Sequence, residues 1–147
     1  MAQYQHIMIA TDFSKHSVQV CDKAKELASH YQAQLSICHV VEDFPLTDFA
    51  YEPMISVDID MREAMLQAAN RQITEQADKL DIAHTNRWVE FGSPGYDIVR
   101  LAVEKHVDLI VVGSHGRRGI RLLLGSTANA ILHHAECDVL AVRLQEK

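Results

Sequence analysis

The sequence lacks the cysteine pattern of a disulfide-linked or zinc-binding protein. Its 147 residues include only three cysteines, an odd number, and none has a partner at the spacing of metal ligands. Small secreted domains and zinc sites both depend on such patterns. We therefore expect Cys21, Cys38 and Cys137 to be reduced, mostly buried thiols of a cytosolic protein.

Long apolar runs and clusters of basic residues are absent as well. The longest apolar runs, such as Leu109–Val112 and Leu122–Leu124, are far too short to cross a bilayer. The first residues show no basic stretch followed by an apolar one, so we expect a cytoplasmic location and no secretory signal. The net charge is -6 and no basic cluster exceeds Arg117–Arg118, which argues against nucleic acid as a main partner.

The chain does contain a regular alternation of two hydrophobic patterns. Short, continuously apolar runs are typical of strands covered on both faces, and they occur at His6–Ala10, Leu35–Val41, Thr85–Phe91, Asp108–Gly113 and Asp138–Leu144. Apolar residues at helical spacing occur at Ser14–Tyr31, Met61–Leu80, Tyr96–Lys105 and Ser126–His134. This order predicts one α/β domain over residues 1–147, a doubly wound parallel sheet of five strands with four helices.

Local signals refine the expected boundaries. Ser14 is expected to cap the first helix. Residues Glu42–Asp60 contain two prolines and several acids without a clean period, so we expect a long connection, often a lid or binding loop. The cluster Gly92–Gly95 is expected to form a turn that precedes the third helix.

Two strand ends carry residues suited to ligand binding, because open α/β sheets bind ligands beyond the carboxyl ends of their strands. One end is Ala10–Ser14, and the other runs from Gly113 to Asn129. In the second, Gly113 and Gly116 allow the backbone to approach a ligand or to take positive φ. Gly125–Thr127 then stands where the fourth helix begins.

The start of that helix is suited to an anion. Backbone N–H groups and the positive end of the helix dipole favour negative charge, and the hydroxyls of Ser126 and Thr127 can add hydrogen bonds. Positive charge could come from Arg117, Arg118 and Arg121. The alternative is structural: the glycines would form a tight turn and Ser126 would only cap the helix. The spacing matches neither a Walker A loop nor Gly-x-Gly-x-x-Gly.

These segments resemble the universal stress protein family. The likeness rests on His-Ile-Met-Ile-Ala-Thr-Asp-Phe-Ser at the start, on Gly113 to Asn129, and on Cys-Asp-Val-Leu-Ala-Val-Arg near the end. It covers essentially the whole chain. It implies a five-stranded Rossmann-like fold of the adenine nucleotide alpha hydrolase-like type and, in one branch of the family, ATP bound between the ends of the first and fourth strands.

The resemblance also implies the residues of a nucleotide site. The matched positions are Thr11 and Asp12 for adenosine, Val40 for adenine, Val112 and Gly113 for base and ribose, and Gly116, Gly125, Ser126 and Thr127 for the phosphates. His115 and Arg117, in the same loop, complete the expected site. His115 is either a general acid or base or a residue that shapes the loop. Asp12 could meet ribose hydroxyls, support Mg²⁺ brought by ATP, or cap the following helix.

One departure from the ATP-binding branch separates the functional hypotheses. Eight residues lie between Gly116 and Gly125, one fewer than in that branch. The shortening is either absorbed near Gly119 or moves Gly116 relative to the phosphates. The glycines favour an ATP-binding regulatory module without enzymatic activity that acts on an unidentified protein partner. The alternatives are a nucleotide-free interaction protein of the universal stress protein A type and a weak ATPase that would rely on Asp12 and His115.

The last strand is expected to form a dimer interface. The resemblance implies dimerisation through this strand, and the segment is apolar, contains no proline and is suited to a sheet edge. The residues expected to pair across a two-fold axis are Val139, Leu140, Ala141 and Val142. Among the nine histidines, His133 and His134 are adjacent and would diverge on a helix, and the others show no metal-ligand spacing, so we do not expect a metal site built from side chains.

Overall fold

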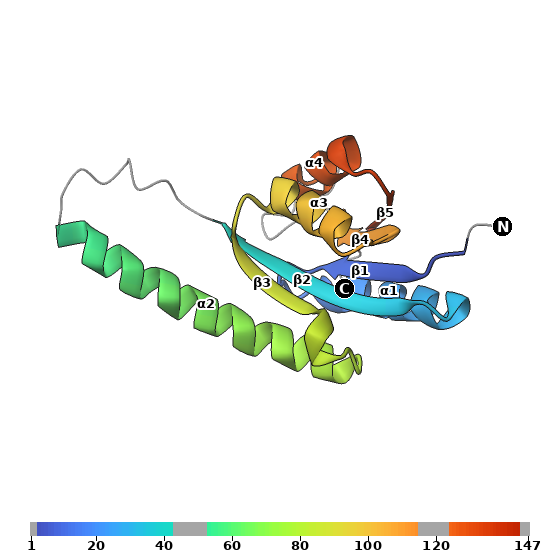
Figure 1. The fold of residues 1–147 in the computed structure, drawn as a ribbon, viewed down its shortest axis with the longest axis horizontal. Helices are drawn as coiled ribbons and strands as arrows, with labels where there is room; N and C mark the ends of the chain where they lie inside the picture. The colour runs from blue at the N-terminus through green and yellow to red at the C-terminus, as the bar shows by residue number, and fades with distance from the viewer. Residues whose placement is uncertain (1–2, 43–52, 115–123, 145–147) are drawn as a thin grey trace.

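The computed structural model describes residues 3–42, 53–114 and 124–144. Its elements alternate along the chain as predicted (Figure 1). The strands are β1 (His6–Ala10), β2 (Gln34–Glu42), β3 (Arg87–Gly92), β4 (Leu109–Gly113) and β5 (Asp138–Val142). The helices are α1 (Ser17–Tyr31), α2 (Pro53–Lys79), the short 3-10 helix η2 (His84–Asn86), α3 (Pro94–Glu104) and α4 (Ser126–His134).

The five strands form one parallel sheet in the order β3-β2-β1-β4-β5. β1 lies at its centre, and all five of its residues are buried. The chain winds outward from β1 to β3, crosses back to β4, and ends at the edge strand β5. This confirms the doubly wound α/β fold. It also places the reversal of strand order between β1 and β4.

Each face of the sheet is covered by two helices. α1 and α2 cover one face, and α3 and α4 cover the other (Figure 1). Because successive strand side chains point to opposite faces, β1 divides between the two cores: Ile7 and Ile9 pack toward α1 and α2, whereas Met8 and Ala10 pack toward α3 and α4. This two-sided burial explains why successive residues of β1 from Ile7 to Ala10 are apolar.

The prediction that Glu42–Asp60 is one long connection is wrong for residues 53–60, which belong to α2. α2 begins at Pro53, a position that suits proline because its φ is already helical and the first N–H of a helix has no partner within the helix. Residues 43–52 lie outside the described ranges. The first turns of α2 reach beyond the sheet, and Ile59 and Met61 are exposed there (Figure 1). The buried residues of α2 come later in the helix, at Ala69, Ile73 and Ala77.

Two other helix starts differ from the prediction. α1 begins at Ser17 rather than Ser14, because Ser14 belongs to a turn that is closed by the side chain of Asp12. α3 begins at Pro94, with Ser93 as its first flanking residue, so the cluster Gly92–Gly95 runs into the helix. The prediction starts α1 three residues too early and α3 two residues too late.

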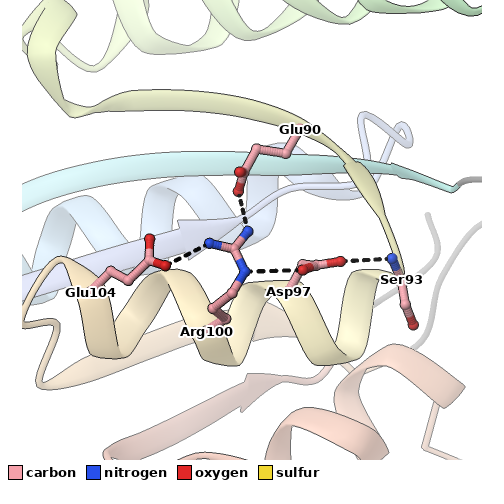
Figure 2. A network of polar contacts seen from close by, with 5 residues as sticks. All are labelled: Glu90, Ser93, Asp97, Arg100 and Glu104. Atoms are coloured by element: carbon pink, nitrogen blue, oxygen red, sulfur yellow. Dashed lines mark hydrogen bonds and ion pairs between the residues drawn. The ribbon is translucent and has the colours of Figure 1, made fainter.

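An arginine on α3 links that helix to β3. The Arg100 guanidinium donates to Glu90 of β3 at 2.8 Å, to Asp97 at 3.1 Å and to Glu104 at 2.9 Å (Figure 2). Asp97 also accepts the Ser93 backbone N–H at 2.8 Å, which ties down the start of α3. The network holds α3 against the strand that precedes it.

The three cysteines are free. Cys21 and Cys38 are buried and Cys137 is half-buried. Burial raises the pKa of the Cys21 thiol to about 11 and that of Cys38 to about 12. These two thiols are therefore protonated near neutral pH and poor nucleophiles.

Among the described residues, none of the helices combines the length and apolar character that a membrane span requires.

Candidate functional site

A cavity of about 1030 Å³ opens where the strands end at the reversal of strand order. All eight of the predicted site residues that the structure describes line it: Thr11, Asp12, Val40, Val112, Gly113, Gly125, Ser126 and Thr127. His115, Gly116 and Arg117 lie outside the described residues, as do Arg118 and Arg121. The fold thus brings both predicted strand ends to one cavity.

The turn after β1 is closed by its own side chains. The backbone N–H of Phe13 donates to the Thr11 hydroxyl at 3.2 Å, and that of Ser14 donates to the Asp12 carboxylate at 2.9 Å. The Thr11 N–H donates to the Cys38 carbonyl at 3.0 Å. These three backbone donors are therefore already used, so they do not form an anion-binding loop. Asp12 shapes this turn rather than capping α1.

Phe13 takes a backbone conformation that is rare for a bulky residue. Its φ is +60°, in the left-handed region. The ring lies against the imidazole of His39 on β2, with 4.2 Å between the ring centroids. Both residues line the cavity. Strain of this kind persists where the surroundings hold it, and it is common in ligand-binding segments.

His39 ties the same turn to β2. Its Nδ1 lies 2.7 Å from the Thr11 carbonyl oxygen. A carbonyl oxygen only accepts, so Nδ1 carries a proton and donates it to Thr11. No pattern in the sequence distinguishes His39 from the other histidines. Among the described residues no three His, Cys, Asp or Glu side chains gather as a metal site would require.

Gln76 on α2 is a second residue that the sequence analysis missed. Its amide oxygen accepts the Thr11 hydroxyl at 2.9 Å, and its amide nitrogen donates to the Ser17 hydroxyl at 2.7 Å. It therefore connects the end of β1 with the start of α1. The sequence gives only a weak indication of this role: Gln76 is a polar residue that lies one helical turn after the core residue Ile73 and next to the core residue Ala77.

The opposite wall of the cavity contains the start of α4. Gly125 precedes the helix in an extended conformation, with φ -62° and ψ 156°, and has no side chain to cap it. Ser126 is the first helical residue, so the expectation that it is the N-cap is wrong, and Gly125 takes that position. The first N–H groups of a helix have no carbonyl partners within it, and they combine with the dipole to favour an anion.

The approach to α4 is held by the end of β4. The Gly125 N–H donates to the Ser114 carbonyl at 2.6 Å, and the Ser114 N–H donates to the Val142 carbonyl at 2.8 Å. These bonds join the helix start to both β4 and β5. Gly113 ends β4 as an extended residue of the sheet and contributes to the cavity wall.

The two ends of the cavity therefore differ in polarity. At the β1 and β2 end, the carboxylates of Asp12 and Glu42 offer acceptors. At the other end, the first turn of α4 offers backbone N–H groups and the hydroxyls of Ser126 and Thr127. Between them, Val40 and Val112 supply buried apolar surface. The arrangement suits a flat, partly apolar ligand with amino or hydroxyl groups at one end and an anion at the other.

Comparison with known proteins gives consistent matches. The family model described as "Universal stress protein family" matches residues 3–143. Universal stress protein A homolog 2 of Coxiella burnetii is 40% identical over 146 residues, which cover 99% of both chains. The structure of the universal stress protein UspA from Lactobacillus plantarum superposes with a TM-score of 0.74 at 28% identity, covering 97% of this chain and 100% of that one.

A further solved structure bears on the ligand. It is described as a universal stress protein in complex with cAMP, and it matches with a TM-score of 0.61 at 29% identity. The match covers 96% of this chain and 98% of that one. A protein of this fold and similar size thus binds a cyclic adenine nucleotide.

Proposed function

The chain belongs to the universal stress protein family, and from this premise we propose that it is a regulatory module that binds an adenine nucleotide, with ATP as the preferred ligand. The observation that carries the proposal is the polarity of the cavity, with acceptors at the end of β1 and a helix start at the other end. Adenosine with a phosphate chain presents the complementary order of groups.

The described site residues other than Thr11 each have a role in this proposal. Val40 and Val112 contact the adenine ring, because they are buried apolar residues of the cavity wall near the ends of β2 and β4 and belong to the same face of the sheet. The Asp12 carboxylate accepts hydrogen bonds from ribose hydroxyls. Gly125, Ser126 and Thr127 hold phosphate oxygens at the start of α4. Gly113 leaves room for the ribose at the end of β4. Thr11, His115, Gly116 and Arg117 stay predicted members of the site.

The size of the cavity is compatible with a nucleoside triphosphate. Small-molecule sites commonly measure roughly 300–1,000 Å³, and this cavity measures about 1030 Å³. The space that a bound nucleotide leaves in the cavity can hold water and a Mg²⁺ ion, which would be bound mainly by phosphate oxygens. Among the described residues that line the cavity, Asp12 and Glu42 are the candidate carboxylates for such an ion.

Calorimetric titration with ATP, ADP and cAMP, each with and without Mg²⁺, tests the proposal. We expect measurable binding of ATP and a rise in melting temperature, because a ligand that binds only the folded state stabilises it. Ser126→Ala and Thr127→Val should weaken binding of ATP more than that of adenosine, since both hydroxyls face the phosphates in this proposal. Ser29→Ala, an exposed serine on α1, is the matched control.

The outcomes separate the alternatives. Absence of heat and of thermal stabilisation at millimolar concentrations of all three nucleotides would overturn the proposal and favour a nucleotide-free interaction protein. Tighter binding of cAMP than of ATP would support an adenine nucleotide site but contradict ATP as the preferred ligand, since cAMP has a single phosphate. Release of phosphate from ATP that is lost in Asp12→Ala would instead indicate a weak ATPase.

We also propose that the protein is a homodimer in the cytoplasm, joined through β5. Among the described strands β5 lies at the sheet edge, and Val139, Leu140, Ala141 and Val142 are half-buried. The Val142 carbonyl bonds toward β4, so the peptide groups of Ala141, the preceding residue, face the open edge. The free cysteines fit the reducing cytoplasm.

Gel filtration with light scattering tests the dimer. Ala141→Pro removes an N–H that faces the open edge without removing a bond to β4, so the monomer should stay folded while the dimer is lost. Ala141→Val keeps the N–H and serves as the control. A dimer that persists in Ala141→Pro at micromolar concentration would rule out this interface.

A further inference from the structure

The cavity extends onto both faces of the sheet. Val40 and Val112, which are proposed to contact adenine, belong to the core on the α3 and α4 face. α2 covers the opposite face (Figure 1), yet four of its residues also line the cavity: Met65, Ala68, Ala69 and Gln72. The cavity therefore continues past the end of the sheet to the face that α1 and α2 cover.

The part of the cavity on the α1 and α2 face, which we call the α2-side subsite, is mostly apolar. Because side chains alternate along a strand, His39 and Val41 of β2 face this side, opposite to Val40. Val41 and Ala69 are buried, so a ligand in contact with them would leave water. The subsite consists of Phe13, His39, Val41, Met65, Ala68 and Ala69.

Two rings and a thioether give the α2-side subsite its character. Phe13 packs against the core on the α1 and α2 face, and its ring centroid lies 4.2 Å from that of His39, with 37° between the ring planes. Met65 supplies a polarizable sulfur, which makes favourable contacts with aromatic rings. Aromatic side chains likewise favour another ring in an offset or edge-on arrangement. These groups together suit a planar aromatic ligand.

The charges around the cavity favour an uncharged ligand in this subsite. Among the described residues that line the cavity there is no lysine or arginine, and the two acids are Asp12 and Glu42. The positive end of the α4 dipole belongs to the other face of the sheet. Gln72 lines both the cavity and a neighbouring groove between α1 and α2, and its amide can bond one polar group of a ligand.

We propose that the α2-side subsite binds a small, uncharged, planar aromatic molecule, beside a nucleotide and independently of it. A nucleotide held by Val40, Val112 and the start of α4 lies on the other face of the sheet, so the two ligands do not compete. The aromatic ligand is recognised by burial against Val41 and Ala69 and by ring contacts with Phe13. The subsite can therefore be occupied whether or not the chain binds ATP.

Indole is the probe, because it is planar and uncharged and carries a single N–H group. Its binding is followed through the resonances of isotope-labelled methionine methyl groups. The Met65 resonance, assigned with Met65→Leu, should shift in a saturable manner. Met61 is exposed on the same helix outside the cavity, and Met8 is buried in the other core, so neither should shift. A shift that does not saturate, or an equal shift of Met61 and Met65, would overturn the proposal.

Ala68→Leu should weaken the binding of indole by about tenfold, because the added carbons fill the subsite and a tight space resists overpacking. Ala64→Leu is the matched control, since it makes the same change about one helical turn earlier, at an exposed alanine outside the cavity. Phe13→Leu removes the ring but keeps an apolar side chain, and it should weaken binding severalfold. It keeps the test decisive if Ala68→Leu does not fold. Unchanged affinity in the folded variants, or an equal loss in Ala64→Leu, would contradict the assignment of the subsite.

Titration with indole in the presence of saturating ATP separates this proposal from the proposed function. The affinity for indole should stay unchanged, because the two ligands lie on opposite faces of the sheet. Displacement of indole by ATP would show that the nucleotide itself occupies the α2-side subsite, which would overturn a separate subsite but support nucleotide binding. Binding of indole without binding of ATP would overturn the proposed function alone. The anionic derivative indoleacetate should bind more weakly than indole, and tighter binding would overturn the assignment of an uncharged ligand.

Discussion

The imidazole of His39 donates a hydrogen bond to the Thr11 carbonyl at 2.7 Å and lies against the ring of Phe13. These two contacts join β2 to the turn that follows β1. They also support the unusual backbone of Phe13, with its φ of +60°. The turn that contributes Thr11 and Asp12 to the cavity is therefore held from the neighbouring strand.

His39→Ala should destabilise the protein by about 1–3 kcal/mol, because it removes the partner of the Thr11 carbonyl in a largely buried position. Urea unfolding measures the change. His84→Ala, at an exposed histidine of η2, should change the stability by less than about 0.5 kcal/mol. Equal effects of the two substitutions would show that the contact does not hold the turn.

Protonation of His6 should make the protein less stable in mild acid. Burial lowers the pKa of His6 below its ordinary value of 6.5, although the Lys105 carbonyl, to which Nδ1 donates at 3.0 Å, opposes the shift. The unfolded chain therefore binds this proton more readily than the folded one. The contribution of His6 is fully present above about pH 6.5 and declines as the pH falls through the pKa of the unfolded state.

His6→Gln tests this pH dependence, since glutamine can donate to Lys105 and accept from Ser36 without titrating. The free energy of unfolding should fall less between pH 7.5 and pH 5.5 in the variant than in the wild type. The comparison cancels the other histidines, which both chains share. Parallel pH profiles for the two chains would contradict the prediction.

Gly95→Ala should destabilise the contact between α3 and α4. A Cβ at Gly95 would lie 2.6 Å from the Cβ of Ala130, closer than two carbon atoms can approach. We expect a loss of about 1–3 kcal/mol in thermal or urea unfolding. The double variant Gly95→Ala, Ala130→Gly should recover part of that loss beyond the sum of the two single changes. Strict additivity would mean that the two residues are not in contact.

Arg100→Ala should lower the stability by about 1 kcal/mol, because its three carboxylate partners link α3 to β3 (Figure 2). The effect is modest since 35% of the side chain is exposed, and it should shrink in 1 M salt. Arg71→Ala, at an exposed arginine of α2, is the control. A loss that is the same at low and high salt would argue against an ionic origin.

The family resemblance and the apolar runs predicted the residues of the site better than capping and turn residues predicted the helix boundaries. Thr11, Asp12 and Ser126 were expected at one cavity, and the structure brings them there because parallel strands end at a common edge. Boundaries were less accurate: Pro53 and Pro94 were read as parts of loops, although both begin helices. A proline has the same local signature in a turn and at a helix start, and only the helix that follows distinguishes them.

The amino-acid sequence by itself determined the alternation of strands and helices, the parallel sheet and the strand ends at which a ligand can bind. These follow from local periodicity and from the general geometry of α/β sheets. Only the tertiary structure decided which polar side chains meet across the fold. Gln76 lies 65 positions from Thr11, and His39 lies 28 positions from it, so no local pattern connects them. Their hydrogen bonds exist because α2 packs on β2 and β3, on one side of β1, and because β2 pairs with β1.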